Sequence, residues 1–477
     1  MLLALALVAA SATAAPAAPV PARFDTAIYA GPVYLEPDTQ QTATATAFRR
    51  IVQSGARYVR VSLYWKNVVS AHPPAGFDAR DPKDPSYRWS VFDGIVKRAV
   101  TRGLTPIVTI WGSPEWAKID GRPPPAGNMA PRPATLANFA FAAATRYGGT
   151  TRGIPRLRYW MIWNEPNYSY YISPVFAGAR PAAPEIYRNL VNAAAESIHA
   201  VHRDNRVIAG GLEPFTHKQP QTIAPLRFMR EFLCVPGNET GCDDRVSFDI
   251  WSMHPYTSGG PTHKAIRPDD VSLGNLPAMK KVLDAAWRSR RIDASRPPAF
   301  WVTEFSWDSN PPDPRGVPMT LEVRWVAEAM YRMWQSGVSL MTWLQLRDDV
   351  AAGDIQSGLY FRGKTGLGSD RAKPLYRAFR FPFVGFRRST SHLTYWGRVP
   401  AGRAGSVRIE LKRGGGGWRR LAVVRANSNG LFTGTLPRSV PRIGFVRAIS
   451  KKDVSPAFSL VVPHDHAVTP FGVGPRG

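Results

Sequence analysis

Short apolar runs alternate with amphipathic helical stretches along most of this chain, and this alternation limits the fold more than any other feature. Such runs are typical of parallel strands that are buried on both faces and joined by covering helices. We expect eight of these strands, at residues 27–33, 58–63, 106–110, 158–163, 206–210, 248–253, 299–303 and 339–343. Eight strand-helix units predict an α/β fold, a (β/α)8 barrel. A doubly wound open sheet would give a similar pattern, but no Gly-rich phosphate loop follows the first run.

The segments between the apolar runs have helical spacing with recognisable ends. Apolar residues recur at helical positions between residues 91 and 100, and Gly103 follows in the position of a helix C-cap. A second helix is expected at residues 321–334, with Thr320 as its N-cap and Gly337 just after its end.

The length of 477 residues and a change in the sequence pattern near Phe383 indicate two domains. Beyond that point, short apolar runs are separated by Gly, Pro and Asn turns, which is typical of an antiparallel β-sandwich. The expected strands are residues 392–399, 407–412, 418–425, 431–436, 444–449 and 458–462. We therefore divide the chain into a barrel domain at residues 23–385 and an all-β domain at residues 386–477.

Residues 1–15 are apolar and end in Ala12-Thr13-Ala14, which resembles a secretory signal with a small-residue cleavage site. The prediction is a signal peptide and linker at residues 1–22 and a secreted protein. No Lys or Arg precedes the apolar run, so an Ala-rich N-terminal tail is the alternative. The run is too short to span a bilayer, and no later stretch approaches that length.

Only two cysteines occur, Cys234 and Cys242, and the residues between them are rich in turn formers. In an exported chain this spacing favours a local disulfide. A zinc site is not expected, because two ligands without a nearby pair of histidines are too few.

The net charge of +26 is unevenly distributed: residues 385–477 hold 16 Lys and Arg residues against Glu410, Asp453 and Asp465. One interpretation is a general compositional bias towards Arg. The other is a domain that attracts anionic polymers such as cell-wall glycans. The cations form no compact run in the sequence, and no nucleic-acid partner is expected.

Two acidic residues end apolar strands of the predicted barrel. Glu165 ends the run Tyr-Trp-Met-Ile-Trp-Asn-Glu, and Glu304 ends the run Ala-Phe-Trp-Val-Thr-Glu. Side chains at the C-terminal ends of barrel strands converge on one mouth, so both are catalytic candidates. Glu115, Glu213 and Asp348 also lie near strand ends, but none sits in an equally specific motif.

The sequence Trp163-Asn164-Glu165-Pro166-Asn167 resembles the acid/base motif on the fourth strand of clan A glycoside hydrolases, particularly families 39 and 5. Thr303-Glu304-Phe305 is similar to the nucleophile motif on their seventh strand, and strand counting places the two glutamates on those strands. The resemblance covers residues 24–385, whereas the C-terminal segment resembles only generic accessory β-sandwiches. It implies a retaining glycosidase that acts on a poly- or oligosaccharide, with Glu165 as acid/base and Glu304 as nucleophile.

This chemistry needs two carboxyl groups about 5 to 5.5 Å apart, one protonated and one ionised. Proximity and apolar surroundings raise the pKa of the acid, and a nearby cation keeps the nucleophile ionised. By the resemblance, Arg60 is that cation; a structural ion pair inside the barrel is the alternative. No cluster of ligands at metal-binding spacing occurs, so we expect neither a metal nor an organic cofactor.

The same resemblance implies further residues around the substrate. Asn164 would bind the sugar 2-hydroxyl, Tyr256 would orient the nucleophile, and His254 would lie near it, although a buried core histidine is an equal alternative. Trp343 would form a sugar platform and Trp111 an aromatic wall. Two rival functions remain: a non-catalytic carbohydrate-binding protein on a barrel scaffold, and a transglycosylase that uses the same two carboxyl groups.

Overall fold

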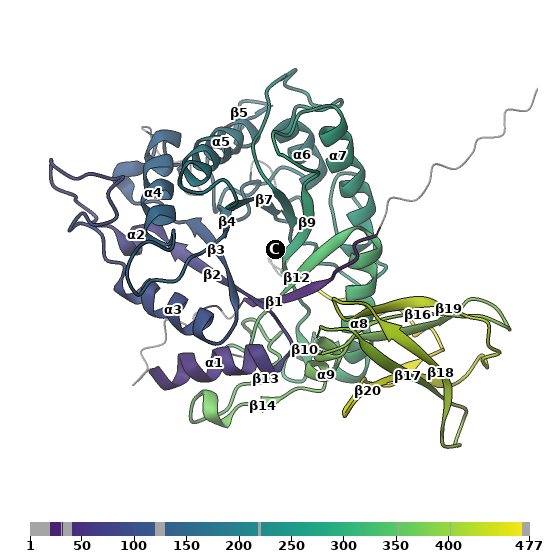
Figure 1. Ribbon diagram of the computed structural model, residues 1–477. Helices are drawn as coiled ribbons and strands as arrows, with labels where there is room; N and C mark the ends of the chain where they lie inside the picture. The colour runs from purple at the N-terminus through teal and green to yellow at the C-terminus, as the bar shows by residue number, and fades with distance from the viewer. Residues whose placement is uncertain are drawn as a thin grey trace, which may run out of the picture.

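The structure is a computed structural model that describes residues 20–29, 31, 41–119, 129–217, 221–351, 353–400 and 402–469. The predicted signal segment therefore lies outside the described residues up to position 19. Figure 1 shows a ring of strands surrounded by helices, with a smaller β domain at one side.

Eight parallel strands form a closed barrel, which confirms the predicted fold class. Parallel pairing of the first strand with the last, in the register Asp25↔Leu340, closes the ring. Each strand coincides with one of the eight predicted apolar runs to within a few residues. The strands are β1 (Asp25–Tyr29), β2 (Tyr58–Tyr64), β3 (Thr105–Trp111), β4 (Tyr159–Ile162), β7 (Arg206–Leu212), β8 (Ile250–Met253), β9 (Ala299–Phe305) and β12 (Val338–Leu344).

Helices cover the outside of the barrel (Figure 1). They are α1 (Gln41–Gln53), α2 (Trp65–Val68), α3 (Ser90–Thr101), α4 (Pro133–Arg146), α5 (Ala183–Val201), α6 (Pro225–Leu233), α7 (Leu276–Arg288), α8 (Met319–Gln335) and α9 (Leu375–Arg380). Gly103 and Gly337 follow α3 and α8 with φ angles of 77° and 88°, the left-handed conformation that suits a glycine after a helix. Thr320 is not the N-cap of α8, because the helix begins one residue earlier and Pro318 precedes it.

The barrel interior is filled at the end where the strands begin. One side chain from each of the eight strands enters this layer: Ala27, Tyr58, Ile107, Met161, Ile208, Ile250, Trp301 and Leu340. A second, larger core lies between the strands and the helices. Because the interior is packed, a functional site is expected at the opposite end, where the strands finish.

The C-terminal domain consists of two antiparallel sheets that pack on each other. One contains β15 (Phe383–Arg387), β16 (Leu393–Arg398) and β19 (Leu431–Leu436), and the other contains β17 (Gly405–Lys412), β18 (Trp418–Ala426), β20 (Phe445–Ser450), β21 (Asp453–Val454) and β22 (Phe458–Ser459). Gly385 allows close approach, since a Cβ there would lie 2.6 Å from Cγ2 of Val446 in the other sheet. Strand β15 includes residues 383–385, so we propose that the domain boundary lies before Phe383.

The two domains share an apolar interface along α8. Trp396 of β16 is fully buried, and its ring centroid lies 6.0 Å from those of both Tyr331 and Trp334. Arg324 of α8 lies over the ring of Phe458, 3.9 Å from its centroid. Removing the β domain would therefore expose aromatic side chains of the barrel to water.

Cys234 and Cys242 form a disulfide, with their Cα atoms 5.2 Å apart. The bridged loop has a second support, because the Glu231 carboxylate accepts a hydrogen bond of 2.6 Å from the hydroxyl of Thr240. No helix among the described residues is both long and apolar enough to cross a membrane.

Reduction of the disulfide is expected to lower the free energy of unfolding by about 2 to 3 kcal/mol, since the closed loop is short. Intact mass of the purified protein before and after reduction, with thiol alkylation, tests the bond itself. Two alkylated thiols in the unreduced protein would show that the cysteines are not paired, and thermal unfolding of Cys242→Ser then measures the contribution to stability.

Candidate active site

The chain makes a sharp turn where β4 meets the barrel mouth. Trp163 and Glu165 have φ angles of 69° and 40°, in a region that residues other than glycine seldom occupy. Hydrogen bonds hold both in place: the Trp163 indole donates to the carbonyl of Tyr171 at 2.8 Å, and the Glu165 N–H donates to the carbonyl of Gly211 at 3.0 Å. The surrounding structure thus sustains a strained backbone at the candidate acid/base, as is frequent at functional sites.

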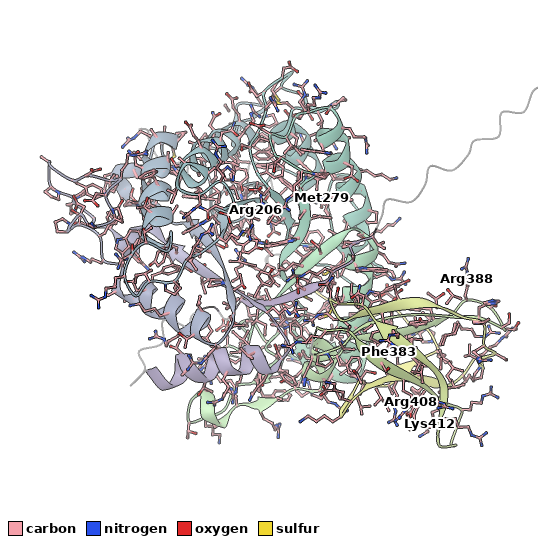
Figure 2. The ribbon with its side chains drawn as sticks, in the orientation of Figure 1. Arg206, Met279, Phe383, Arg388, Arg408 and Lys412 are labelled. Carbon is pink, nitrogen blue, oxygen red and sulfur yellow. A yellow bond between two sulfur atoms is a disulfide. The ribbon has the colours of Figure 1, made fainter. Side chains whose placement is uncertain are left out.

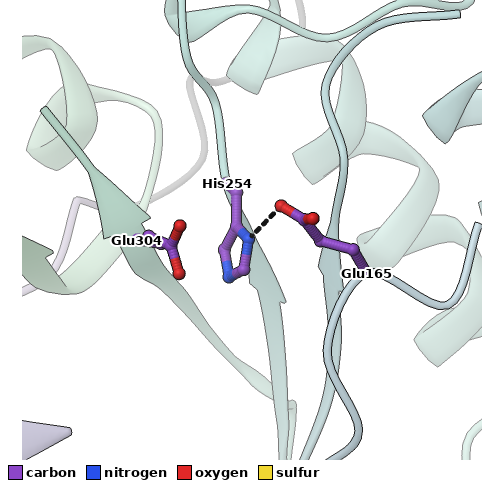
Figure 3. A group of neighbouring side chains, drawn as sticks. All are labelled: Glu165, His254 and Glu304. Atoms are coloured by element: carbon purple, nitrogen blue, oxygen red, sulfur yellow. Dashed lines mark hydrogen bonds and ion pairs between the residues drawn. The ribbon is translucent and has the colours of Figure 1, made fainter. Parts of the chain in front are cut away.

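The turn brings Glu165 close to Glu304. One ligand atom each of Glu165, His254 and Glu304 lies within 4.8 Å of the others, and Figure 3 shows His254 between the two glutamates. The closest oxygens of the two carboxyl groups are therefore no more than 4.8 Å apart. Both side chains are largely shielded from water, with exposed fractions of 9% for Glu165 and 17% for Glu304.

Positive charge and a phenol surround Glu304. Arg60 of β2 donates from Nη1 to Oε2 of Glu304 at 2.6 Å, and Tyr256 donates from its hydroxyl to Oε1 at 2.8 Å. Burial acts to raise the pKa of Glu304, but the charges of His254 and Arg60 and the two hydrogen bonds outweigh it and lower that pKa. Glu304 is thus kept ionised.

Glu165 has the opposite electrostatic environment. Burial is the largest influence and raises its pKa, the hydrogen bond with His254 opposes this, and the charge of Glu304 raises it further. His254 Nδ1 lies 3.0 Å from Oε1 of Glu165, in the contact drawn in Figure 3. Two neighbouring carboxyl groups therefore have pKa values displaced in opposite directions, which is the arrangement that separates an acid from a nucleophile.

Arg60 also fixes the orientation of Asn164. Its Nη2 donates to the amide oxygen of Asn164 at 2.7 Å, and its Nε donates to the hydroxyl of Thr109 at 3.0 Å. Because the amide oxygen of Asn164 is engaged, the amide nitrogen is the atom left to donate to a ligand. Thr109 could not be singled out from the sequence, since a threonine within a buried strand is common for packing reasons alone.

His254 is fully buried and uses both ring nitrogens. Besides the contact with Glu165, its Nε2 lies 3.1 Å from the hydroxyl of Thr303, the residue before Glu304. The ring therefore bridges the fourth and seventh strands and fixes the spacing of the two glutamates. Thr303 was visible in the sequence only as part of the Thr-Glu-Phe motif.

Aromatic side chains line one side of this group. Trp111, at the end of β3, has its ring centroid 4.7 Å from Tyr64 and 5.4 Å from Tyr171. Burial raises the pKa of Tyr171, and the charges of Glu165 and Glu304 contribute to that shift. The carbonyl of Tyr171 accepts the hydrogen bond from the Trp163 indole, which ties this residue to the turn that carries Glu165. We propose that these rings form an aromatic wall beside the site.

The structure does not bring Trp343 to this group of residues. Trp343 is fully buried, donates from its indole to the carbonyl of Ser357 at 2.8 Å, and has its ring centroid 6.2 Å from that of Phe379 in α9. The alternation of side chains along β12 explains this. Leu340 points into the barrel, so residue 343, three positions further along, points outward towards the helices. We therefore leave Trp343 out of the proposed site.

The three competing acids differ in position. Glu213 is buried near the two catalytic candidates, and burial together with the charges of Glu165 and Glu304 raises its pKa well above the usual range. Its Oε1 lies 3.2 Å from Nε2 of His217. Asp348 belongs to a separate buried pair with Lys373 at 2.6 Å, and the side chain of Glu115 is 87% exposed.

Glu165, His254 and Glu304 are also close enough together to hold a metal ion. However, both nitrogens of His254 already have partners, and the Arg60 guanidinium supplies positive charge directly on Glu304. These contacts suit two separately tuned carboxyl groups better than a metal centre.

Comparisons with known proteins give distant structural similarity only. No family model and no curated protein sequence matches the chain. Among solved structures, it is similar to a glucosidase from Croceicoccus marinus, with 13% identity, a TM-score of 0.46 and coverage of 82% of this chain and 89% of the other. A β-glucosidase from Thermotoga maritima has 14% identity, a TM-score of 0.46 and coverage of 75% of this chain and 97% of the other.

A further similar structure is that of β-glucuronidase 2 from Bacteroides uniformis, with 11% identity and a TM-score of 0.43. The match covers 94% of this chain but only 46% of that protein. Similarity at this level shows neither an activity nor a substrate for this chain.

Proposed function

We propose that the protein is a retaining glycoside hydrolase that cleaves O-glycosidic bonds in a poly- or oligosaccharide by double displacement. The observation that supports this most strongly is the pair Glu165 and Glu304. Their carboxyl oxygens approach within 4.8 Å and their pKa values are displaced in opposite directions. A retaining mechanism needs a separation of about 5 to 5.5 Å, whereas inversion needs about 6.5 to 9.5 Å to admit water.

In the first step, ionised Glu304 attacks the anomeric carbon and the bond to the leaving oxygen breaks. Glu165, protonated because its pKa is raised, gives its proton to that oxygen. Tyr256 and Arg60 hold the two oxygens of Glu304 and so aim the carboxylate. The amide nitrogen of Asn164 donates to the 2-hydroxyl of the sugar, a contact that strengthens as positive charge develops on the ring.

In the second step, Glu165 is a carboxylate and takes a proton from water, which attacks the anomeric carbon of the glycosyl-enzyme. The bond to Glu304 breaks and the carboxylate is restored. Two inversions at one carbon give net retention. His254 keeps Glu165 in position for both proton transfers.

The disulfide supports the further proposal that the protein is secreted, because such bonds persist in oxidising compartments. The rivals named above share this site. A transglycosylase differs only in that a sugar hydroxyl replaces water in the second step, and a binding protein would hold the sugar without turnover.

A screen of chromogenic glycosides and purified cell-wall polysaccharides tests the proposal. With the first active substrate, NMR of the initial product is expected to show the anomeric configuration of the substrate. An inverted initial product would contradict double displacement. Products extended by an added acceptor would identify a transglycosylase, and oligosaccharide binding without release of any product would identify a binding protein.

A further inference from the structure

The larger sheet of the C-terminal domain has one face that is unusually rich in cations. In antiparallel pairs, opposed residues share a face, so the registers of β17 with β18 and β20 define it. Arg408 is opposite Val423, Glu410 is opposite Arg420 and Arg447, and Lys412 is opposite Trp418 and Phe445. We call this the basic face; its residues are Ser406, Arg408, Glu410, Lys412, Trp418, Arg420, Val423, Arg425, Phe445, Arg447 and Ile449.

Five cations on the basic face are opposed by one acid. Glu410 is held between Arg408 at 2.8 Å and Arg447 at 2.8 Å, so it balances part of their charge. Within the described ranges, Lys412, Arg420 and Arg425 have no acidic partner. The face therefore carries excess positive charge that only something outside the chain can neutralise.

The basic face is open to solvent, whereas the centre of the reverse face of the same sheet is buried and only its edge, at Arg419, is exposed. Arg408, Arg420 and Arg425 are exposed, and so are Val423 at 58% and Phe445 at 42%. On the reverse face, Val407, Ile409 and Val446 are fully buried against the other sheet. Figure 2 places Arg408 and Lys412 at the edge of the domain away from the barrel, with Arg388 on a different side.

The geometry of a sheet spreads these cations over a flat lattice. Neighbouring strands lie about 4.8 Å apart, and alternate residues along a strand lie about 6.8 Å apart. The face is therefore suited to a chain molecule with repeating negative charges and not to a small anion, which needs a concave site. Exposed Phe445 and Val423 add apolar contact of the kind that sugar ring faces accept.

We propose that the basic face binds an extended acidic polysaccharide, one with repeating carboxylate or sulfate groups, and so holds the barrel on its substrate. The choice of a polysaccharide over another polyanion rests on the glycosidase function proposed above. Attraction to the polymer is electrostatic and falls as salt rises, because screening shortens the Debye length to about 8 Å at 0.15 M ionic strength. Binding uses no residue of the barrel mouth.

The test uses the full chain, since the domain interface along α8 makes truncation unsafe. The face variant is Arg420→Glu with Arg425→Glu, which reverses two exposed cations that have no acidic partner. The matched control is Arg388→Glu with Arg438→Glu. Both arginines are exposed and lie in the same domain, and their replacement changes the net charge by the same amount as the face variant. Affinity is measured for polygalacturonate, dextran sulfate, neutral dextran and single-stranded DNA at low and high salt.

The face variant is expected to bind both acidic polysaccharides about tenfold or more weakly than wild type, and the control within about twofold. Neither variant is expected to bind neutral dextran. An equal loss in both variants would show that net charge alone acts, and unchanged binding by the face variant would place the surface elsewhere; either result overturns the proposal. If DNA binds more tightly than the acidic polysaccharides, and the face variant loses that binding, the partner is a nucleic acid and the proposal is overturned as well.

Failure of this proposal is distinguishable from failure of the glycosidase function. Turnover of a small chromogenic glycoside should be the same in wild type, face variant and control, because that substrate does not reach the basic face. If the protein hydrolyses no substrate but still binds acidic polysaccharide through the basic face, the binding proposal stands and the glycosidase function is rejected.

Discussion

Replacing Glu304 with alanine is expected to abolish turnover of every substrate, with a loss of about 10⁵-fold or more, because no glycosyl-enzyme can form without it. Glu165→Ala should lose much less on activated aryl glycosides, whose leaving groups depart without a proton, than on natural substrates. Initial rates on one activated and one unactivated substrate check this difference. Circular dichroism and thermal unfolding of both variants serve as the folding control.

Azide distinguishes the two roles by stereochemistry. In Glu165→Ala it should attack the glycosyl-enzyme and give a glycosyl azide of retained configuration. In Glu304→Ala it should replace the nucleophile and give the inverted product. Swapped outcomes would reverse the assigned roles, and wild-type rates in both variants would place the active site elsewhere.

Glu213→Gln provides the matched control for these experiments. Glu213 is a third buried carboxyl group near the pair, but it has no hydrogen bond to Glu165 or Glu304 among the described contacts. Its replacement is expected to cost far less activity and to show no rescue by azide. Azide rescue of this variant with retained configuration would instead make Glu213 the acid/base.

The parts of the fold that follow a simple periodicity were predictable from the sequence. Each barrel strand overlaps one of the expected apolar runs, and Gly103 and Gly337 mark helix ends through their positive φ angles. The direction of each side chain in a barrel strand was harder to predict. A strand that is buried on both faces is apolar at every position, so its sequence does not show which side chains point inward. The resemblance placed Trp343 at the mouth, and the apolar pattern of its strand could not show that the ring lies towards α9.

The residues that contact the two glutamates illustrate a second limit of prediction from the sequence. A local motif identified Glu165 and Glu304, and the resemblance named Arg60 and His254, but their hydrogen bonds to the two glutamates and to Thr303 depend on how separate strands meet in space. Likewise, the cations of the basic face looked diffuse because they lie in three strands, and only the pairing register brings them onto one surface. Charge that is scattered in a sequence is concentrated by a sheet.

Replacing Arg60 with methionine is expected to have the second largest effect. Activity needs Glu304 ionised and Glu165 protonated, so the pH profile should be bell-shaped, with the acidic limb from Glu304 and the alkaline limb from Glu165. The Arg60 charge helps to lower the pKa of Glu304, so its loss raises that pKa and moves the acidic limb to higher pH. The loss of rate at neutral pH should be about 10² to 10³-fold, because an aligned charged donor is also removed.

Arg60→Lys is the matched control, because it keeps the charge but cannot reach Glu304, Asn164 and Thr109 at once. Its acidic limb should move less than that of Arg60→Met, while its maximal rate still falls as Asn164 loses its fixed orientation. A purely structural ion pair would instead lower the unfolding temperature of both variants and leave the pH limbs of the folded fraction unchanged. Profiles of kcat/KM against pH, normalised to the folded fraction, decide between the two. The Arg60 charge lowers the pKa of Glu165 as well as that of Glu304, so an electrostatic role moves both limbs to higher pH, whereas a purely structural role moves neither.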